Sequence, residues 1–548
     1  MALRTPIRFS QDLIVGNVAA EHDQDFLENC FIDTGLINSV TSSETRKSVL
    51  LGRTGSGKSA LLQALEAKVS HPIRIDPQQF SLQHISNSTV LNYFEQLGVK
   101  LDPFYQALWN HLFVVELIKA KYKIAGAPHG ASILGRLAAL FSSDTRIKCL
   151  KYLESWGEEH FWQETETRAL EITSRFEDRL QSEIGASASI LSARTTADTA
   201  ETSEIKKEIA LRAQRMVDAI QLRELHQIVD VFSEELFSDE QNSYYLLIDD
   251  LDQQWAENRI RYKLIRALLD TIRRFRRIPA VRVVICLRRD LLEMVIEETR
   301  DSGFQEEKYE DLYLTLHWSD KDLRNIIDSR ITFAIKRKYA RQERVGFFDI
   351  MPDKVFGMNT LSYMLERTHK RPREIIQFVN KVLAQAAGSS QIAQTTISEA
   401  ESKYSEQRRN AVYDEWRENY PMLRQCARLL AGKPARFRIS DITFPELQDC
   451  VLAVAMSFSD NSELTKEAKF IVEKGAAFKS SDLFNFARHL AVMLYTTGLV
   501  GIKIGSQSAP HWSPLSEFRI SPESIHMDDL IYVHPMFYRV FGVNPAVG

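Results

Sequence analysis

Eight consecutive residues near the start of the chain have the types and spacing needed to hold a phosphate group. Glycines at three of the positions let the backbone turn tightly and point several N–H groups at one anion. An apolar run at 49–51 precedes them and a helical pattern follows, which is the context in which this motif binds phosphate. The alternative is a glycine-rich turn that matches by chance. The loop, with the residue after it, is Gly52, Arg53, Thr54, Gly55, Ser56, Gly57, Lys58, Ser59 and Ala60.

Two side chains of this phosphate loop (residues 52–59) would contact a nucleoside triphosphate and its metal ion. Lys58 would reach the β- and γ-phosphates, and the Ser59 hydroxyl would ligate Mg²⁺. The helix that begins near Lys58 would add the partial positive charge of its N-terminal end. The sequence therefore predicts ATP and Mg²⁺ as ligands.

A carboxylate pair follows the apolar run at 244–248, in the Walker B pattern. An uninterrupted apolar run is typical of a buried parallel strand, and such a sheet places its ligands at the carboxyl ends of the strands. Asp249 would hold Mg²⁺ through water, and Asp250 would orient and deprotonate the attacking water. The alternative is that these acids only cap the helix that follows.

Two arginines are candidates for contacts with the γ-phosphate. Arg288 follows the apolar run at 281–287 and would act there as a sensor, with Arg289 as its rival. Arg373 lies in an Arg-Pro-Arg turn, where Pro372 suits the first turn of a helix, and would point from a helical lid toward the nucleotide. The alternative for Arg373 is a solvated basic turn.

A basic cluster at Arg273, Arg274, Arg276 and Arg277 has three readings. It could complete the site of a neighbouring subunit as an arginine finger, it could bind the phosphate backbone of DNA, or it could be a solvated helix face. The first reading requires a homo-oligomer.

The pattern of apolar runs predicts an α/β fold with a parallel sheet of five strands, near 48–51, 73–76, 244–248, 281–287 and 312–316. Residues 1–85 would hold the N-terminal segment and the first part of the core, and 238–318 its second part. Residues 86–237 would be a helical insertion for partner contacts, or else a cap that only buttresses the core. It includes a charged helix at 150–184, a linker at 185–203 and a helix at 204–236.

The remainder of the chain is expected to be a helical lid without strands at 319–405 and a winged-helix-like domain at 406–548. In the lid, Ser319 is expected to cap a helix at 322–337. In the last domain, helices are followed by short strands near 498–504 and 530–533. Basic and acidic side chains balance there, so DNA binding through this domain is an open alternative to protein binding.

Bulk composition is that of an ordinary globular protein. Of 548 residues, 44% are hydrophobic and 26% charged, and the net charge of −4 favours no class of partner. Five cysteines without a C-x-x-C pair suit a reducing compartment and indicate no zinc site. With neither a signal peptide nor an apolar run of about 20 residues, we expect a cytoplasmic protein without a membrane segment.

The order of these motifs resembles the AAA+/STAND superfamily branch that includes origin-recognition-type ATPases. The Asp-Asp-x-Asp form at 249–252, with Arg288 after the fourth strand, is more similar to STAND and KAP-type ATPases. The N-terminal segment at 20–34, followed by the phosphate loop, resembles bacterial FunZ-like P-loop ATPases. Where the family pattern near Arg373 usually has a glycine, this chain has Lys370.

The resemblance implies an ASCE-type P-loop ATPase that converts ATP and water to ADP and phosphate as a switch or assembly subunit. It also implies a bacterial defence or regulatory system, with a protein partner or effector encoded by another gene. An initiator-like protein that binds DNA with ATP and hydrolyses little is the alternative.

Overall fold

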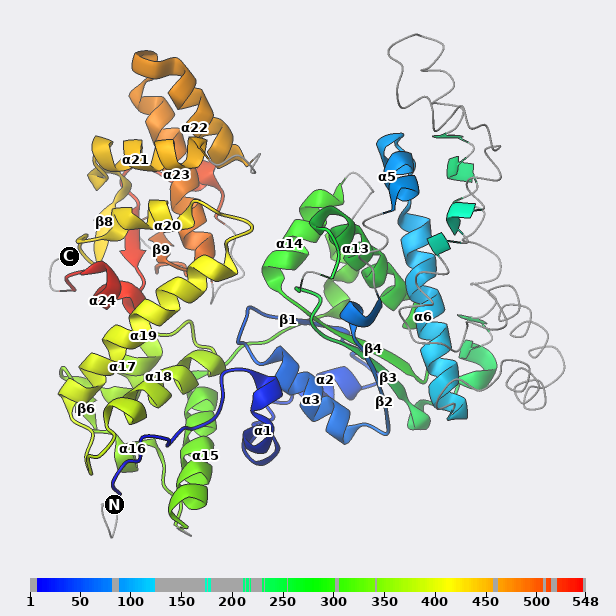
Figure 1. Cartoon of the computed structure of the whole chain (residues 1–548), viewed down its shortest axis with the longest axis horizontal. Coiled ribbons are helices and arrows are strands. Elements are labelled where there is room, and N and C mark those ends of the chain that lie inside the picture. The colour runs from blue at the N-terminus through cyan, green and yellow to red at the C-terminus, as the bar shows by residue number, and fades with distance from the viewer. Residues whose placement is uncertain are drawn as a thin grey trace. The chain divides into compact units, whose positions relative to one another are not determined.

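The computed structural model of the chain is shown in Figure 1. It packs as two compact units. We call them the lid unit (Met1–Ile32, Arg53–Gly57 and His317–Gly548) and the sheet unit (Asp33–Gly52 and Lys58–Leu316). The structure describes residues 7–80, 88–123, short pieces between 173 and 230, 232–253, 255–300, 305–340, 343–456, 462–505, 509–513 and 520–545.

The sheet unit contains a five-stranded parallel sheet, as the apolar runs predicted. Its order is β2-β3-β4-β1-β5, and every neighbouring pair is parallel. The three central strands are buried along their whole length because both faces of the sheet are covered. The strands are β1 (Val49–Leu51), β2 (His71–Ile75), β3 (Tyr244–Ile248), β4 (Val281–Leu287) and β5 (Tyr313–Thr315).

Two long helices of the sheet unit pack closely against each other. The Trp109 indole of α6 donates a hydrogen bond of 2.9 Å to the carbonyl of Leu264 in α13, and Phe113 meets Phe275 edge to face. Both helices are mostly buried, so α6 belongs to the core of this unit. The helices are α2 (Leu36–Thr41), α3 (Lys58–Lys68), α5 (Thr89–Gln96), α6 (Asp102–Tyr122), α13 (Asn258–Phe275) and α14 (Arg289–Glu298).

Most of the expected insertion is not covered by the structure. Most of the helix expected at 150–184, the linker at 185–203 and most of the helix at 204–236 lie outside the described residues. The helices α5 and α6 and the short described pieces at 173–178 and 210–217 are helical as expected.

The first half of the lid unit is helical, with one exception. Ser319 caps α15 as expected, because its hydroxyl accepts the Asp322 N–H at 3.1 Å and the Asp322 carboxylate binds back. Pro372 opens α18. The prediction of no strands was wrong, since β6 (Lys354–Val355) and β7 (Met358–Asn359) form a short hairpin. The helices are α1 (Gln24–Cys30), α15 (Asp320–Tyr339), α16 (Phe347–Ile350), α17 (Thr360–Glu366), α18 (Pro372–Gln385) and α19 (Gln394–Glu415).

The C-terminal part of the lid unit combines helices with a three-stranded antiparallel sheet in the order β8-β10-β9. The sequence predicted β9 (Val500–Lys503) and β10 (Leu530–Val533) but not β8 (Arg436–Arg438), which has only one buried side chain, Phe437. The helices are α20 (Leu423–Cys426), α21 (Phe444–Ala455), α22 (Glu463–Lys474), α23 (Ser480–Thr497) and α24 (Tyr538–Phe541).

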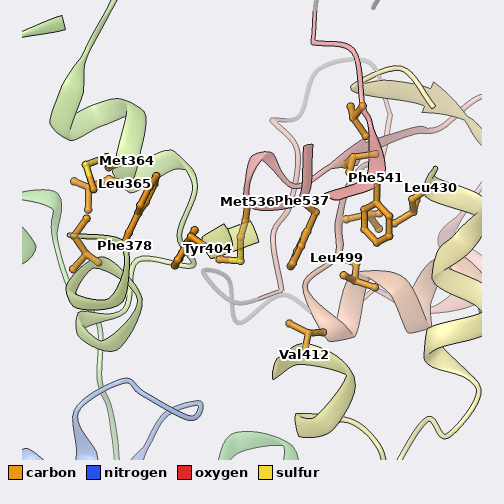
Figure 2. Packing of buried hydrophobic residues seen from close by; sticks show 14 of the residues in the cluster. Met364, Leu365, Phe378, Tyr404, Val412, Leu430, Leu499, Met536, Phe537 and Phe541 are labelled. Carbon is orange, nitrogen blue, oxygen red and sulfur yellow. The ribbon is translucent and has the colours of Figure 1, made fainter. Parts of the chain in front are cut away.

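One hydrophobic core runs through both halves of the lid unit. Phe378 stacks on Tyr404 with ring centroids 4.5 Å apart, and the next residue of α19, Ser405, donates a 2.6 Å hydrogen bond to the carbonyl of Met536. Figure 2 shows these aromatic side chains together with Met536 and Phe537 from the C-terminal part. Helix α19 therefore contributes to the core in both the first half and the C-terminal part of the lid unit.

No helix in the described part of the chain is long and apolar enough to cross a membrane.

Candidate functional site

In the sheet unit, the ends of three neighbouring strands bring the predicted polar residues to one edge. β4 lies between β1 and β3, with Leu51 opposite Leu287 and Ile248 opposite Ile285. Gly52, Asp249 and Arg288 each follow directly after one of these strands. Because the strands are parallel, all three residues leave the same edge of the sheet, where open α/β sheets place their ligands.

Lys58 lies at this edge among acidic groups. Its Nζ donates a 2.9 Å hydrogen bond to the carbonyl of Gly52. Burial lowers the pKa of Lys58, and the charges of Asp252 and Asp249 act against this shift. Ser59 and Ala60 follow in the first turn of α3, and both are half-buried. This edge of the sheet therefore holds a largely desolvated ammonium group close to carboxylates.

The carboxylate pair has an unusual backbone. Asp249 is buried, and its Oδ1 accepts the Asp250 N–H at 2.9 Å. Asp250 has a φ of 58°, in the left-handed region that residues other than glycine seldom adopt. Such backbone strain is found most often at functional sites, where the surrounding structure holds it. Asp250 itself is half-buried.

A neutral thiol lies beside this pair. Burial and the charge of Asp249 raise the pKa of Cys286 well above its ordinary value. No motif pointed to Cys286, but its position in β4 puts it beside the end of β3, which Asp249 follows. Because the thiol is protonated, it adds no negative charge to that of the carboxylates at this edge.

Arg288 is held by its neighbours. Its Nε and Nη2 bind the two carboxylate oxygens of Asp290 at 3.1 and 2.5 Å, and its Nη1 lies 3.8 Å from Asp252 Oδ2. The rival Arg289 lies in the first turn of α14, with Nε 3.7 Å from Glu293 Oε1. Of the two, Arg288 is therefore the one that lies near the acidic edge.

The middle of the phosphate loop, Arg53–Gly57, packs in the lid unit, where three residues bind its carbonyl groups. Arg371 Nη1 donates to the carbonyl of Thr54 at 3.1 Å, and the Trp318 indole donates to that of Ser56 at 2.7 Å. The backbone N–H of Arg373 lies 3.4 Å from the carbonyl of Gly55. Sequence reasoning missed Arg371 and Trp318, because residues that bind carbonyl groups have no motif.

These contacts determine which side of the loop can receive a ligand. In a trans peptide the C=O and the following N–H point in opposite directions. With the carbonyls of Thr54, Gly55 and Ser56 turned toward lid residues, the following N–H groups point the other way. The N–H of Ser56 donates to the Arg53 carbonyl at 3.2 Å, so a ligand on this side would be bound by those of Gly55 and Gly57. Gly55 and Gly57 have φ values of +79° and +95°, which glycine adopts readily.

Two buried hydroxyls in this loop have no partner within the described residues, those of Thr54 and Ser56. A buried polar group without a hydrogen bond is unfavourable, and each native case calls for an explanation. Phosphate oxygens could accept from both hydroxyls and from the N–H side of the loop. The residues present therefore fit a phosphate group.

Arg373 lies against the phosphate loop and the N-terminal segment. Its Nε donates to the carbonyl of Val18 at 3.0 Å, and burial lowers its pKa. A Cβ at Gly55 would lie 2.8 Å from the Arg373 side chain. Arg373 is thus packed rather than solvated. Lys370, which stands where the family pattern has a glycine, has a φ of 52°.

The N-terminal segment has a packing role. Arg330 of α15 binds Asp23 at 2.7 Å and the carbonyl of Val15 at 3.1 Å, and all of these groups are buried. Phe26 of α1 meets Phe333 edge to face. The segment is therefore fixed to the lid helices.

A buried carboxylate holds Arg371 in place. Glu374 is 1% exposed and accepts Arg408 Nη2 at 2.8 Å and the His369 N–H at 2.5 Å, with Arg371 Nη1 at 3.6 Å. Burial alone would raise the pKa of Glu374, but Arg408 and Arg371 hold it well below the ordinary range. The ionised carboxylate of Glu374 thus lies next to Arg371, the arginine that binds the loop.

Within the described residues, no three His, Cys, Asp or Glu side chains gather as a metal-binding group. Mg²⁺ is usually held by one or two protein oxygens, together with substrate phosphates and water. Ser59 and Asp249 offer that kind of donor set, so they fit this ion and not a metal held only by protein.

Three of the four arginines in the basic cluster at the end of α13 make contacts within the sheet unit. Arg273 lies over the Tyr309 ring at 4.9 Å, Arg274 binds Gln106 at 3.4 Å, and Arg276 Nη2 donates to the carbonyl of Thr45 at 3.3 Å. Burial also lowers the pKa of Arg274. These contacts give the cluster a structural role, and the readings as DNA contact or arginine finger stay predictions.

Residues 321–413 match the FunZ-associated C-terminal helical domain. This region runs from α15 to α19 and includes the turn with Arg371 and Arg373. The match supports a FunZ-like protein. No curated protein matches the chain.

Proposed function

We propose that this chain binds ATP with Mg²⁺ and hydrolyses it, as a nucleotide-dependent switch or assembly subunit of the P-loop ATPase class. The observation that carries the proposal is the strand order, in which β4 separates β1 from β3. This order brings the ends that carry the phosphate loop, Arg288 and the carboxylate pair to one edge of the sheet, which is what an ASCE-type site requires.

Each of the predicted site residues has a proposed role in binding or hydrolysis. Lys58 would bind the β- and γ-phosphates, and its lowered pKa indicates a cation that an anion would stabilise. Asp250 would orient and deprotonate the attacking water. Arg288 and Arg373 would stabilise the negative charge that develops in the transition state, so that catalysis rests on position and electrostatics.

Two residues are proposed to hold the metal ion. Ser59 and Asp249 would hold Mg²⁺, which when bound neutralises charge on the phosphate oxygens. Asp249 is buried and its Oδ1 already accepts one N–H, so the carboxylate is fixed in orientation.

The lid unit would transmit the nucleotide state. Its C-terminal part combines the helices α21, α22 and α23 with a sheet in the order β8-β10-β9, and this combination supports a winged-helix-like domain. The FunZ-associated match supports a lid of the FunZ type. A homo-oligomer and a separate effector protein remain proposals that follow from the family resemblance.

The test compares Lys58→Ala with Lys68→Ala in nucleotide binding and steady-state hydrolysis. Hydrogen bonds to charged groups contribute about 1.5–3 kcal/mol, so Lys58→Ala should weaken ATP binding about 10- to 150-fold. Lys68, near the other end of α3, pairs with Asp33 at the surface and should be neutral. A wild-type protein that binds no ATP, or equal activity in both variants, would refute the proposal.

A further inference from the structure

One side chain of the phosphate loop, that of Arg53, contacts three segments of the C-terminal part of the lid unit. Its Nη2 donates to the carbonyl of Thr496 and, at 3.0 Å, to the hydroxyl of Ser513. Its guanidinium lies 5.3 Å from the ring centroid of Trp416. Thr496 is in α23, Trp416 follows the last residue of α19, and Ser513 lies between β9 and β10, so one arginine joins three segments.

Each contact has a physical reason to be stabilising. The last carbonyls of a helix lack intrahelical partners, and a cation is favoured at the negative end of the helix dipole. Arg53 supplies both a donor and a charge in the last turn of α23. Its position over Trp416 adds a cation–π interaction. Arg53 thus acts as a C-terminal cap of α23 from a distant part of the sequence.

The backbone next to Arg53 is held by the same unit. Arg371 and Trp318 bind the carbonyls of Thr54 and Ser56, and the buried Glu374 lies behind Arg371. The carbonyl side of the loop and the Arg53 side chain are therefore both fixed to the lid unit. A ligand on the N–H side would restrict the same few peptide groups from the opposite direction.

We propose that Arg53 reports phosphate binding on the loop to the end of α23 and to the segment around Ser513. The inference rests on the proposed nucleotide binding. Because the loop already has its carbonyls turned to the lid, phosphate on its N–H groups strengthens this conformation and with it the docking of Arg53. By linkage, the docking strengthens nucleotide binding to the same extent. Arg53 is a positioning residue in this account, since it acts through the loop.

The test is hydrogen exchange of the full chain, followed by mass spectrometry of peptides that span residues 494–503, with and without ADP–Mg²⁺ or a non-hydrolysable ATP analogue. In the wild type, nucleotide should slow exchange there about fivefold or more. Arg53→Ala should lose this response and bind nucleotide about fivefold more weakly. The matched control is Arg424→Ala, which removes an arginine over the Tyr413 ring in the same unit and should keep the response.

Two further variants keep the test decisive if Arg53→Ala does not fold. Arg53→Lys retains the charge without the forked donor group, and Ser513→Ala removes one partner of Arg53. Both should fold, bind nucleotide and show a reduced response. Wild-type protein that binds nucleotide with unchanged or faster exchange at 494–503 overturns the inference and leaves the proposed function standing. Absence of nucleotide binding overturns both.

Discussion

Replacing Glu374 with glutamine should destabilise the lid unit strongly, although the change is a single atom. The carboxylate is 1% exposed, accepts a hydrogen bond from Arg408 at 2.8 Å and lies 3.6 Å from Arg371 Nη1. The amide cannot balance these two buried cations. Removing one partner of a buried ion pair costs about 3–5 kcal/mol, because the remaining charge stays desolvated.

This free energy corresponds to a large shift in melting temperature. For a unit of this size, each kcal/mol lowers the midpoint by about 2–4 °C, so Glu374→Gln should melt about 6–20 °C below the wild type. Circular dichroism would follow the transition, and hydrogen exchange of α18 peptides would assign it to the lid unit. The control is Glu406→Gln in α19, whose exposed carboxylate lies 3.9 Å from Arg409 and should contribute less than about 1 kcal/mol.

The effect should also depend on pH in one direction. Glu374 has a pKa well below the ordinary range in the folded state, whereas an unfolded glutamate titrates near about 4.3. Ionised Glu374 therefore contributes stability above about pH 4.3, and the contribution is lost as pH falls toward the folded pKa. The difference between wild type and Glu374→Gln should shrink below that pH. A variant within about 2 °C of the wild type at neutral pH would refute the reasoning.

Three further predictions concern the candidate site. Gly55→Ala should weaken both stability and nucleotide binding, because its φ is +79° and its Cβ would lie 2.8 Å from Arg373. The control Gly388→Ala has only the strain of its φ of +84°, about 1–2 kcal/mol. Melting and binding curves of the two variants make the comparison. Asp250→Asn should bind ATP without turnover, which a hydrolysis assay would show. Asp250→Ala should in addition lower the free energy of unfolding by about 1 kcal/mol, because alanine tolerates a φ of 58° less well, and a melting assay would show this. Because burial lowers the pKa of Lys58, a bound phosphate should raise it, so calorimetry in two buffers at alkaline pH should detect proton uptake that Lys58→Ala lacks.

Several local features could be read from the sequence because short-range physics determines them. Uninterrupted apolar runs marked the three central strands β1, β3 and β4, since a strand covered on both faces has no polar side, whereas β2 and β5 were marked by shorter patterns that include polar residues. Ser319 and Pro372 marked the starts of α15 and α18, because capping and the fixed φ of proline act within one turn. The short strand β8 was missed, since one buried side chain gives no detectable period.

The surroundings of the candidate site were not available from the sequence. Trp318 and Arg371 bind carbonyl groups of the loop, and Arg53 binds Thr496, more than 400 positions along the chain. Such partners carry no motif, because any donor at the right place in space can satisfy a carbonyl group.

The sequence by itself determined the strands of the parallel sheet, the starts of several helices and the polar residues that follow the strands. Period, capping and glycine spacing are local properties, and they place the phosphate loop after one strand and the carboxylate pair after another. Only the tertiary structure decided that β4 lies between those strands and that Glu374 is a buried anion behind Arg371. Strand order and burial depend on packing between distant segments, which local patterns do not encode.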